Sequence, residues 1–187
     1  MTDDERRLLD LARQGDTQAF GELVGRYKTA VFRAALAALR SPEEAEDVAQ
    51  EAFWSAYRQL GTFRGEASFK TWVTTIAWRR ALDRRGGLLR RLRRIVPLRD
   101  ASGAVAAAGP DQEKRSIDAD LAGRAARLIG ALPASLRDPL LLFATGEHTC
   151  EEIGVLLGVP TGTVKWRLSQ GRRRVRERLR RMGCVDE

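Results

Sequence analysis

Apolar residues recur every three or four positions along most of the first half of this chain, which is the period of an amphipathic helix. One such stripe covers residues 17–39 and a second covers residues 42–60. The second stripe opens with Ser41, Pro42 and Glu44, which combine a helix cap, a proline in the first turn and a glutamate three residues after the cap. The pattern therefore predicts two helices with an abrupt break between them.

A polar loop follows these two helices, and Ser68 is the expected cap of a third one. Aromatic and cationic residues alternate around its start, as they do on surfaces that stack unpaired bases while holding the nucleic-acid backbone. Among them, Trp72 fits the inner stripe of the helix, which favours a place in the core. Phe63 and Lys70 lie beside the loop, which favours a binding role for them.

The chain then passes through a stretch without a clear period. Glycine and proline punctuate residues 86–112, which predicts a linker that is partly helical at most. A new apolar stripe starts near Ser116 and is broken at Pro133. Asp138 followed by Pro139 is the expected cap and first turn of the next, apolar helix. Two helical domains on either side of a linker are therefore expected.

Residues 151–181 predict a helix, a tight turn and a strongly basic second helix, which is the pattern of a helix-turn-helix DNA reader. Gly158 suits the turn, because glycine adopts left-handed backbone conformations without strain. Thr161, after Pro160, is expected to cap the second helix. The outer face of that helix is left with Lys165, Trp166, Ser169, Gln170 and Arg172.

Positive charge is concentrated in two segments of the chain. The whole chain has 33 Lys and Arg against 25 Asp and Glu, a net charge of +8. Residues 165–181 hold nine basic and one acidic residue, net +8, and residues 79–94 hold eight arginines and one aspartate, net +7, so the remainder is at −7. Two such segments predict contact with two stretches of nucleic-acid backbone, although either alone is also typical of a solvated surface.

Other kinds of chemistry find little support in the sequence. Two cysteines are too few for a disulfide framework and fit reduced thiols. Together with His148, Cys150 and Cys184 lack the paired spacing of zinc ligands, so no metal site is predicted. No apolar run is long enough to span a bilayer, and the acidic start is unlike a signal peptide. We therefore expect a cytoplasmic protein without direct membrane insertion.

Two segments resemble conserved regions of one protein family. Residues 41–85, SPEEAEDVAQEAFWSAYRQLGTFRGEASFKTWVTTIAWRRALDRR, resemble region two of bacterial sigma factors of the extracytoplasmic-function (ECF) type. Residues 131–179, ALPASLRDPLLLFATGEHTCEEIGVLLGVPTGTVKWRLSQGRRRVRERL, resemble region four. Such factors direct RNA polymerase to promoters. The resemblance implies an all-α fold of two small domains, residues 1–88 and 116–187, joined by a flexible linker of residues 89–115.

The resemblance also implies three binding surfaces. Contact with the clamp helices of the largest polymerase subunit is implied for Glu46, Asp47, Gln50 and Glu51. Opening and capture of the minus-ten promoter element is implied for Phe63, Lys70, Trp72, Trp78, Arg79 and Arg80. Binding of the minus-thirty-five element is implied for Thr163, Lys165, Trp166, Arg167, Ser169, Gln170 and Arg172.

The chain departs from the family pattern at several of these positions. Trp78 and Arg79 stand where Arg-Asn usually follows the Ile-Ala of the third helix. Trp166 stands where a serine is common, and an indole there would press on thymine methyl groups or sugars. An unusual promoter preference is therefore expected.

The implied function is that of a sigma subunit without catalytic activity or cofactor. Its implied partners are core RNA polymerase, promoter DNA and an anti-sigma protein. A stand-alone helix-turn-helix regulator is the main alternative, but it leaves the first domain unexplained. An enzyme is disfavoured, because the chain has one histidine, no Gly-rich phosphate loop and no nucleophile elbow.

Overall fold

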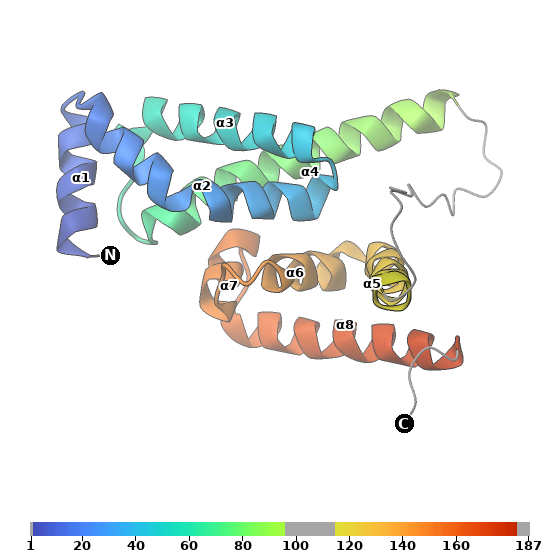
Figure 1. Ribbon diagram of the computed structural model, residues 1–187. Coiled ribbons are helices and arrows are strands. Elements are labelled where there is room, and N and C mark those ends of the chain that lie inside the picture. The colour runs from blue at the N-terminus through green and yellow to red at the C-terminus, as the bar shows by residue number, and fades with distance from the viewer. Residues whose placement is uncertain (1, 96–114, 183–187) are drawn as a thin grey trace.

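The computed structural model describes residues 2–95 and 115–182, and every regular element within these ranges is a helix. The predicted all-α fold class is therefore confirmed. Figure 1 shows the helices in two lobes, one above the other. The first lobe holds α1 (Asp3–Arg13), α2 (Thr17–Leu39), α3 (Pro42–Arg58), the short 3-10 helix η1 (Leu60–Thr62) and α4 (Phe69–Ile95). The second lobe holds α5 (Arg115–Gly130), α6 (Ala134–Ala144), α7 (Cys150–Leu157) and α8 (Thr161–Arg181).

Local capping explains where the first-lobe helices begin and end. Helix α2 ends at Arg40, whose φ of 61° lies in the left-handed region. The Ser41 side chain then accepts a hydrogen bond from the backbone N–H of Glu44 at 3.3 Å, and Pro42 occupies the first helical position of α3. Ser68 accepts a hydrogen bond from the backbone N–H of Thr71 at 3.1 Å, at the start of α4. The predicted break and both predicted caps are confirmed.

Helix α4 is longer than the sequence pattern predicts. It continues through Gly86 and Gly87 to Ile95, so residues 86–95 of the predicted linker are helical. A glycine inside a helix costs only about 1 kcal/mol relative to alanine, and the leucines and arginines around these two are good helix formers. Residues 96–112 of the predicted linker lie outside the described residues.

Two helix starts in the second lobe also differ from the prediction. Pro139 does not restart a helix: it lies buried inside α6, which already begins at Ala134 after Pro133. The missing N–H of Pro139 removes one backbone hydrogen bond near the start of the helix, and burial of its ring against the core offsets that loss. Thr161 is the first helical residue of α8 rather than its cap, since the cap position is Pro160, which makes no side-chain hydrogen bond.

The buried apolar side chains of the two lobes form one continuous core. Trp78, Phe69 and Leu23 are among the fully buried side chains of the first lobe, and Leu142 and Ile153 are among those of the second. The lobes touch where α7 contacts α4 and where α6 contacts α2. The two expected helical domains are present, and in this structure they dock on each other. No helix within residues 2–95 and 115–182 combines the length and apolar character needed to cross a membrane.

Candidate nucleic-acid interface

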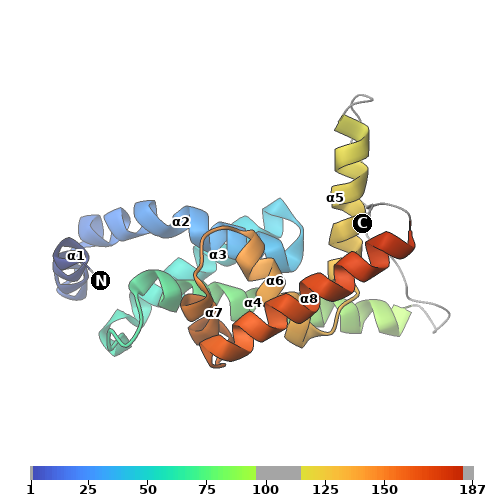
Figure 2. The ribbon, with the colours of Figure 1, turned by 90° about the horizontal axis from the view of Figure 1, so that it is seen from below.

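Helix α8 presents an open, basic face. Its buried residues Val164, Leu168 and Gly171 lie on the side that contacts α6 and α7. Figure 2 shows α8 nearest the viewer and turned away from the first lobe. Of the predicted minus-thirty-five residues, Lys165, Trp166, Ser169 and Arg172 are exposed, and Thr163, Arg167 and Gln170 are half-buried. The structure thus brings these seven residues together, and we call them the recognition face.

The turn before α8 fixes this helix against α7. Gly158 ends α7 with a left-handed φ of 65°, and the backbone N–H of Val159 donates to the carbonyl oxygen of Gly154 at 2.9 Å. The approach is close, because a Cβ added to Gly154 would lie 2.8 Å from the Val159 carbonyl oxygen. These backbone contacts set how closely α7 and α8 approach each other, and the buried side chains of both helices complete their packing.

Several side chains of the recognition face have few competing partners among the described residues. Trp166 is 60% exposed, and Lys165 makes only a loose ion pair with Glu151 at 3.9 Å. Arg172 lies over the ring of Phe143, with its guanidinium carbon 4.7 Å from the ring centroid. This cation–π contact orients Arg172 while leaving its N–H groups available to an acceptor.

An acidic face on α3 carries the residues predicted to contact the polymerase. Glu46, Asp47 and Gln50 are exposed, and Glu51 is half-buried. Glu51 accepts a hydrogen bond from Nη1 of Arg80 at 3.2 Å and pairs with Arg84, which also lies 3.6 Å from Asp47. The acidic face, defined as these four residues, is therefore tied to α4 by arginines.

One residue beside the acidic face was not singled out by the sequence pattern. Trp54 follows Gln50 by one helical turn, is 63% exposed and stacks on Tyr57 with ring centroids 6.4 Å apart. Exposed aromatic side chains are enriched at protein interfaces. Trp54 lies next to the acidic face and therefore extends the surface that a partner could contact. The inner stripe of α3 was easier to find, since its residues recur at helical spacing whereas Trp54 breaks the polar outer pattern.

The predicted minus-ten residues are divided between surface and interior. Phe63 is 5% exposed and Trp78 is 1% exposed, although DNA contact was predicted for both. Phe63 packs against the half-buried Trp72 with ring centroids 5.0 Å apart. Arg79 is exposed, whereas Arg80 is engaged with Glu51. Aromatic residues alternate with arginines both on helices that face a core and on surfaces that stack bases. The sequence pattern therefore did not distinguish buried aromatic residues from DNA-binding ones.

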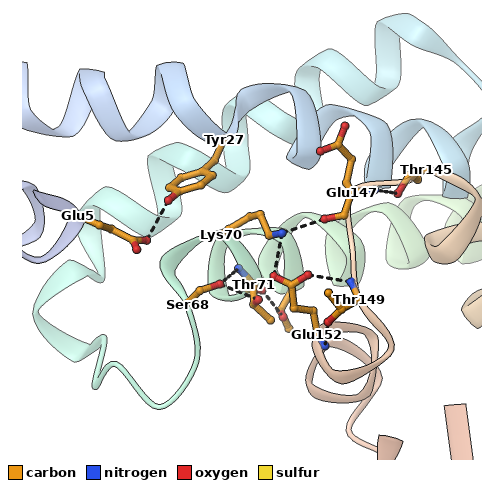
Figure 3. Close-up of polar contacts among 10 residues, drawn as sticks. Glu5, Tyr27, Ser68, Lys70, Thr71, Thr145, Glu147, Thr149 and Glu152 are labelled. Atoms are coloured by element: carbon orange, nitrogen blue, oxygen red, sulfur yellow. Dashed lines mark hydrogen bonds and ion pairs between the residues drawn. The ribbon is translucent and has the colours of Figure 1, made fainter. Parts of the chain in front are cut away.

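Lys70 points to the second lobe (Figure 3). Its Nζ donates to the backbone carbonyl oxygen of Glu147 at 2.8 Å and lies 2.8 Å from Oε1 of Glu152. Glu152 also accepts a hydrogen bond from the backbone N–H of Thr149 at 2.9 Å, which completes a capping box at the start of α7. Burial alone would raise the pKa of Glu152, but the hydrogen bonds from Lys70 and Thr149 outweigh it and lower that pKa.

His148 is buried in the same place, at 6% exposure. Neither of its ring nitrogens has a hydrogen-bond partner within the described residues. Burial lowers the pKa of His148, and the nearby Lys70 lowers it further, against the opposing effect of Glu152 and Glu147. Among the residues that the structure describes, no three His, Cys, Asp or Glu side chains gather as metal ligands, and Cys184 lies outside that part of the chain.

The buried His148 predicts a loss of stability at mildly acidic pH. Because its folded-state pKa is below the ordinary 6.5, the unfolded chain takes up the proton first as the pH falls. The free energy of unfolding should therefore decrease from about pH 7.5 to about pH 5.5, and less so in His148→Gln. Urea unfolding followed by circular dichroism measures both, and an equal decrease in the two proteins would contradict the prediction.

Family models and similar proteins match both lobes of the chain. The family model described as sigma-70 region 2 matches residues 23–95, and that described as sigma-70, region 4 matches residues 122–175. The ECF RNA polymerase sigma factor SigW of Bacillus subtilis strain 168 is 31% identical over 187 residues, which covers 94% of this chain and 96% of that protein. The RNA polymerase sigma-H factor of Pseudomonas aeruginosa is 32% identical over 183 residues, covering 94% of this chain and 93% of that protein.

A solved structure supports the fold. The sigma factor RpoE from Bartonella quintana, crystallised in complex with the anti-sigma factor NepR, superposes with a TM-score of 0.61 at 20% identity. The match covers 90% of this chain and 98% of that one. With two family models in the expected order and full-length relatives above 30% identity, the chain belongs to the ECF group of the sigma-70 family of RNA polymerase sigma factors.

Proposed function

We propose that this chain is a promoter-specificity subunit of bacterial RNA polymerase, which binds the core enzyme and directs the initiation of transcription. The observation that carries the proposal is the presence of two different open surfaces on one chain. The acidic face of α3 lies on the first lobe, and the recognition face of α8 lies on the second. A DNA reader alone needs only the second surface.

Each surface has a distinct part in the mechanism. The acidic face, Glu46, Asp47, Gln50 and Glu51, binds basic side chains of the polymerase clamp. Lys165, Trp166, Ser169 and Gln170 enter the major groove at the minus-thirty-five element, where base edges carry the sequence information. Thr163, Arg167 and Arg172 bind phosphates there, helped by the backbone amides at the start of α8, which have no side-chain cap.

The minus-ten surface is the start of α4 with the arginines further along that helix. Arg79 is exposed and available to phosphates. Lys70 and Arg80 join it when they leave their present glutamate partners. Phe63, Trp72 and Trp78 support this surface from the core, and a flipped base needs Phe63 or Trp72 to become accessible. Nucleotide addition remains the work of the polymerase, so the chain itself performs no catalysis, needs no cofactor and acts in the cytoplasm with the core enzyme.

An anti-sigma protein is the proposed regulator of this chain. The family resemblance supports this partner, and the similar Bartonella quintana factor was crystallised with an anti-sigma factor. Such a protein would cover one or both of the open surfaces. The stand-alone regulator is less well supported, because it gives no role to the acidic face.

Transcription in vitro tests the proposal. The purified chain is mixed with core polymerase and fragmented host DNA, and the start sites of the transcripts are mapped. We expect a stoichiometric complex with the core enzyme and a small set of start sites that share two upstream elements. A protein that binds DNA but forms no complex with the core enzyme would be the stand-alone regulator.

A further inference from the structure

We propose that the second lobe is a built-in cover of the minus-ten surface, and that Lys70 is the latch that must change partners before this surface binds DNA. The inference rests on the proposed function, because it assigns Lys70 to promoter phosphates in the open form. In the closed form seen here, the same amine is held by two oxygens of the second lobe. Figure 3 shows it between Glu147 and Glu152.

The latch satisfies most of the bonding capacity of Lys70. An ammonium group has three N–H donors, and two oxygens at 2.8 Å take up two of them. The side chains of Lys70 and Glu152 are only 23% and 22% exposed. A DNA phosphate would compete with Glu152 for the same N–H donors, so the amine cannot serve both fully at once.

A second set of contacts joins the lobes through α2. Nη1 of Arg33 lies 2.6 Å from Oε1 of Glu147, and Arg40 donates to the backbone carbonyl oxygen of Ala126 at 2.6 Å. The loop between α6 and α7 is thus held from both α2 and α4, with His148 buried within it. These contacts keep the second lobe over the start of α4.

Two features of the contact between the lobes destabilise the docked state. Neither nitrogen of the buried His148 is hydrogen-bonded within the described residues, which penalises the docked state relative to a hydrated one. Burial lowers the pKa of Arg85, and the like charge of Arg137 on the second lobe adds to this effect. The contact between the lobes therefore contains ion pairs and a buried imidazole without hydrogen bonds to the part of the chain that the structure describes. Such a contact is less stable than one made of apolar side chains alone.

Docking of the lobes leaves the other two surfaces free. Lys165, Trp166, Ser169 and Arg172 of the recognition face are exposed, as are Glu46, Asp47 and Gln50 of the acidic face. Core polymerase and the minus-thirty-five element therefore have access to the closed form, whereas capture of the minus-ten element requires opening. The cover therefore sets the order of binding: the minus-ten surface becomes available to DNA only after the two lobes separate.

The neighbouring glutamates 151 and 152 provide a matched test. Glu152→Gln removes the charge that holds Lys70 but keeps an acceptor for the Thr149 N–H, since glutamine also serves in a capping box. Glu151→Gln makes the same change of net charge at an exposed residue, which forms a loose ion pair with Lys165 at 3.9 Å. Circular dichroism checks that both variants fold as the unmodified chain does.

Two readouts follow each variant. Small-angle X-ray scattering of the free chain reports whether the lobes separate, and fluorescence anisotropy reports binding of a labelled non-template minus-ten strand from a promoter mapped as above. Apparent affinity scales with the fraction of open chain, so a form that is open about one tenth of the time gains up to about tenfold. We expect Glu152→Gln to enlarge the particle and bind the strand more tightly, and Glu151→Gln to change neither.

A charge swap tests the latch without touching Lys70. Arg33→Glu should open the lobes and strengthen binding of the strand, although its added negative charge by itself weakens DNA binding. Combining Arg33→Glu with Glu147→Arg should close them again. Identical scattering from Glu152→Gln, Glu151→Gln and the unmodified chain would overturn the cover. The scattering comparison uses neither polymerase nor promoter, so it tests the cover alone. Failure of the proposed function would be seen in a different experiment, as the absence of a complex with core polymerase.

Discussion

Reversing one charge on the acidic face, in Asp47→Arg, is expected to lower the affinity for core RNA polymerase at least about tenfold, or ~1.4 kcal/mol. Asp47 is 68% exposed at its side chain and lies in the middle of this face. An arginine there opposes basic side chains of the clamp, and it also stands beside Arg84, which is 3.6 Å from the present carboxylate. Like charges brought together across an interface suppress association.

The fold should tolerate this change. Asp47 is exposed, arginine is a good helix former, and surface substitutions usually alter stability by less than about 0.5 kcal/mol. Glu22→Arg is the matched control, because it reverses an exposed charge on α2 away from this face. Surface plasmon resonance with immobilised core enzyme measures the affinity. If both variants lose affinity equally, net charge rather than the acidic face governs docking.

The second large effect is expected on the recognition face. Lys165→Ala combined with Trp166→Ala should reduce transcription from a mapped promoter at least about tenfold while leaving the affinity for core polymerase unchanged. Both side chains are open, with Trp166 at 60% exposure. A side chain that binds a base edge well contributes about 1–3 kcal/mol to discrimination, so losing two such contacts is enough for this loss.

The division of labour between the lobes decides how this result is interpreted. Lys28→Ala, an exposed lysine on α2, controls for the loss of one positive charge and should retain transcription. Core binding is measured on the same preparations. If the double variant loses core binding and transcription to the same degree, the two surfaces do not act separately, and the assignment of α8 to the minus-thirty-five element fails.

Much of this molecule follows from interactions between residues close together in the chain. The break after α2, the caps at Ser41 and Ser68, and the turn at Gly158 were all predicted, because each depends on a few neighbouring residues. The outer face of α8 was expected from helical spacing, and the family resemblance implied the four residues of the acidic face. The capping box of Thr149 and Glu152 was missed, although its spacing is visible in the sequence.

The tertiary structure alone decided which of these residues are covered. Phe63 and Trp78 are core residues: Phe63 packs against Phe69 and Trp72, and Trp78 is buried in the core that the helices of both lobes share. Lys70 is bound to an oxygen 77 residues further along the chain, and Glu152, its other partner, lies in the other lobe. Local periodicity carries no information about such pairings, because burial and ion pairing depend on which surfaces meet once the helices have formed. The sequence thus determined the helices and their exposed chemistry, and packing between the lobes determined which binding surfaces stay open.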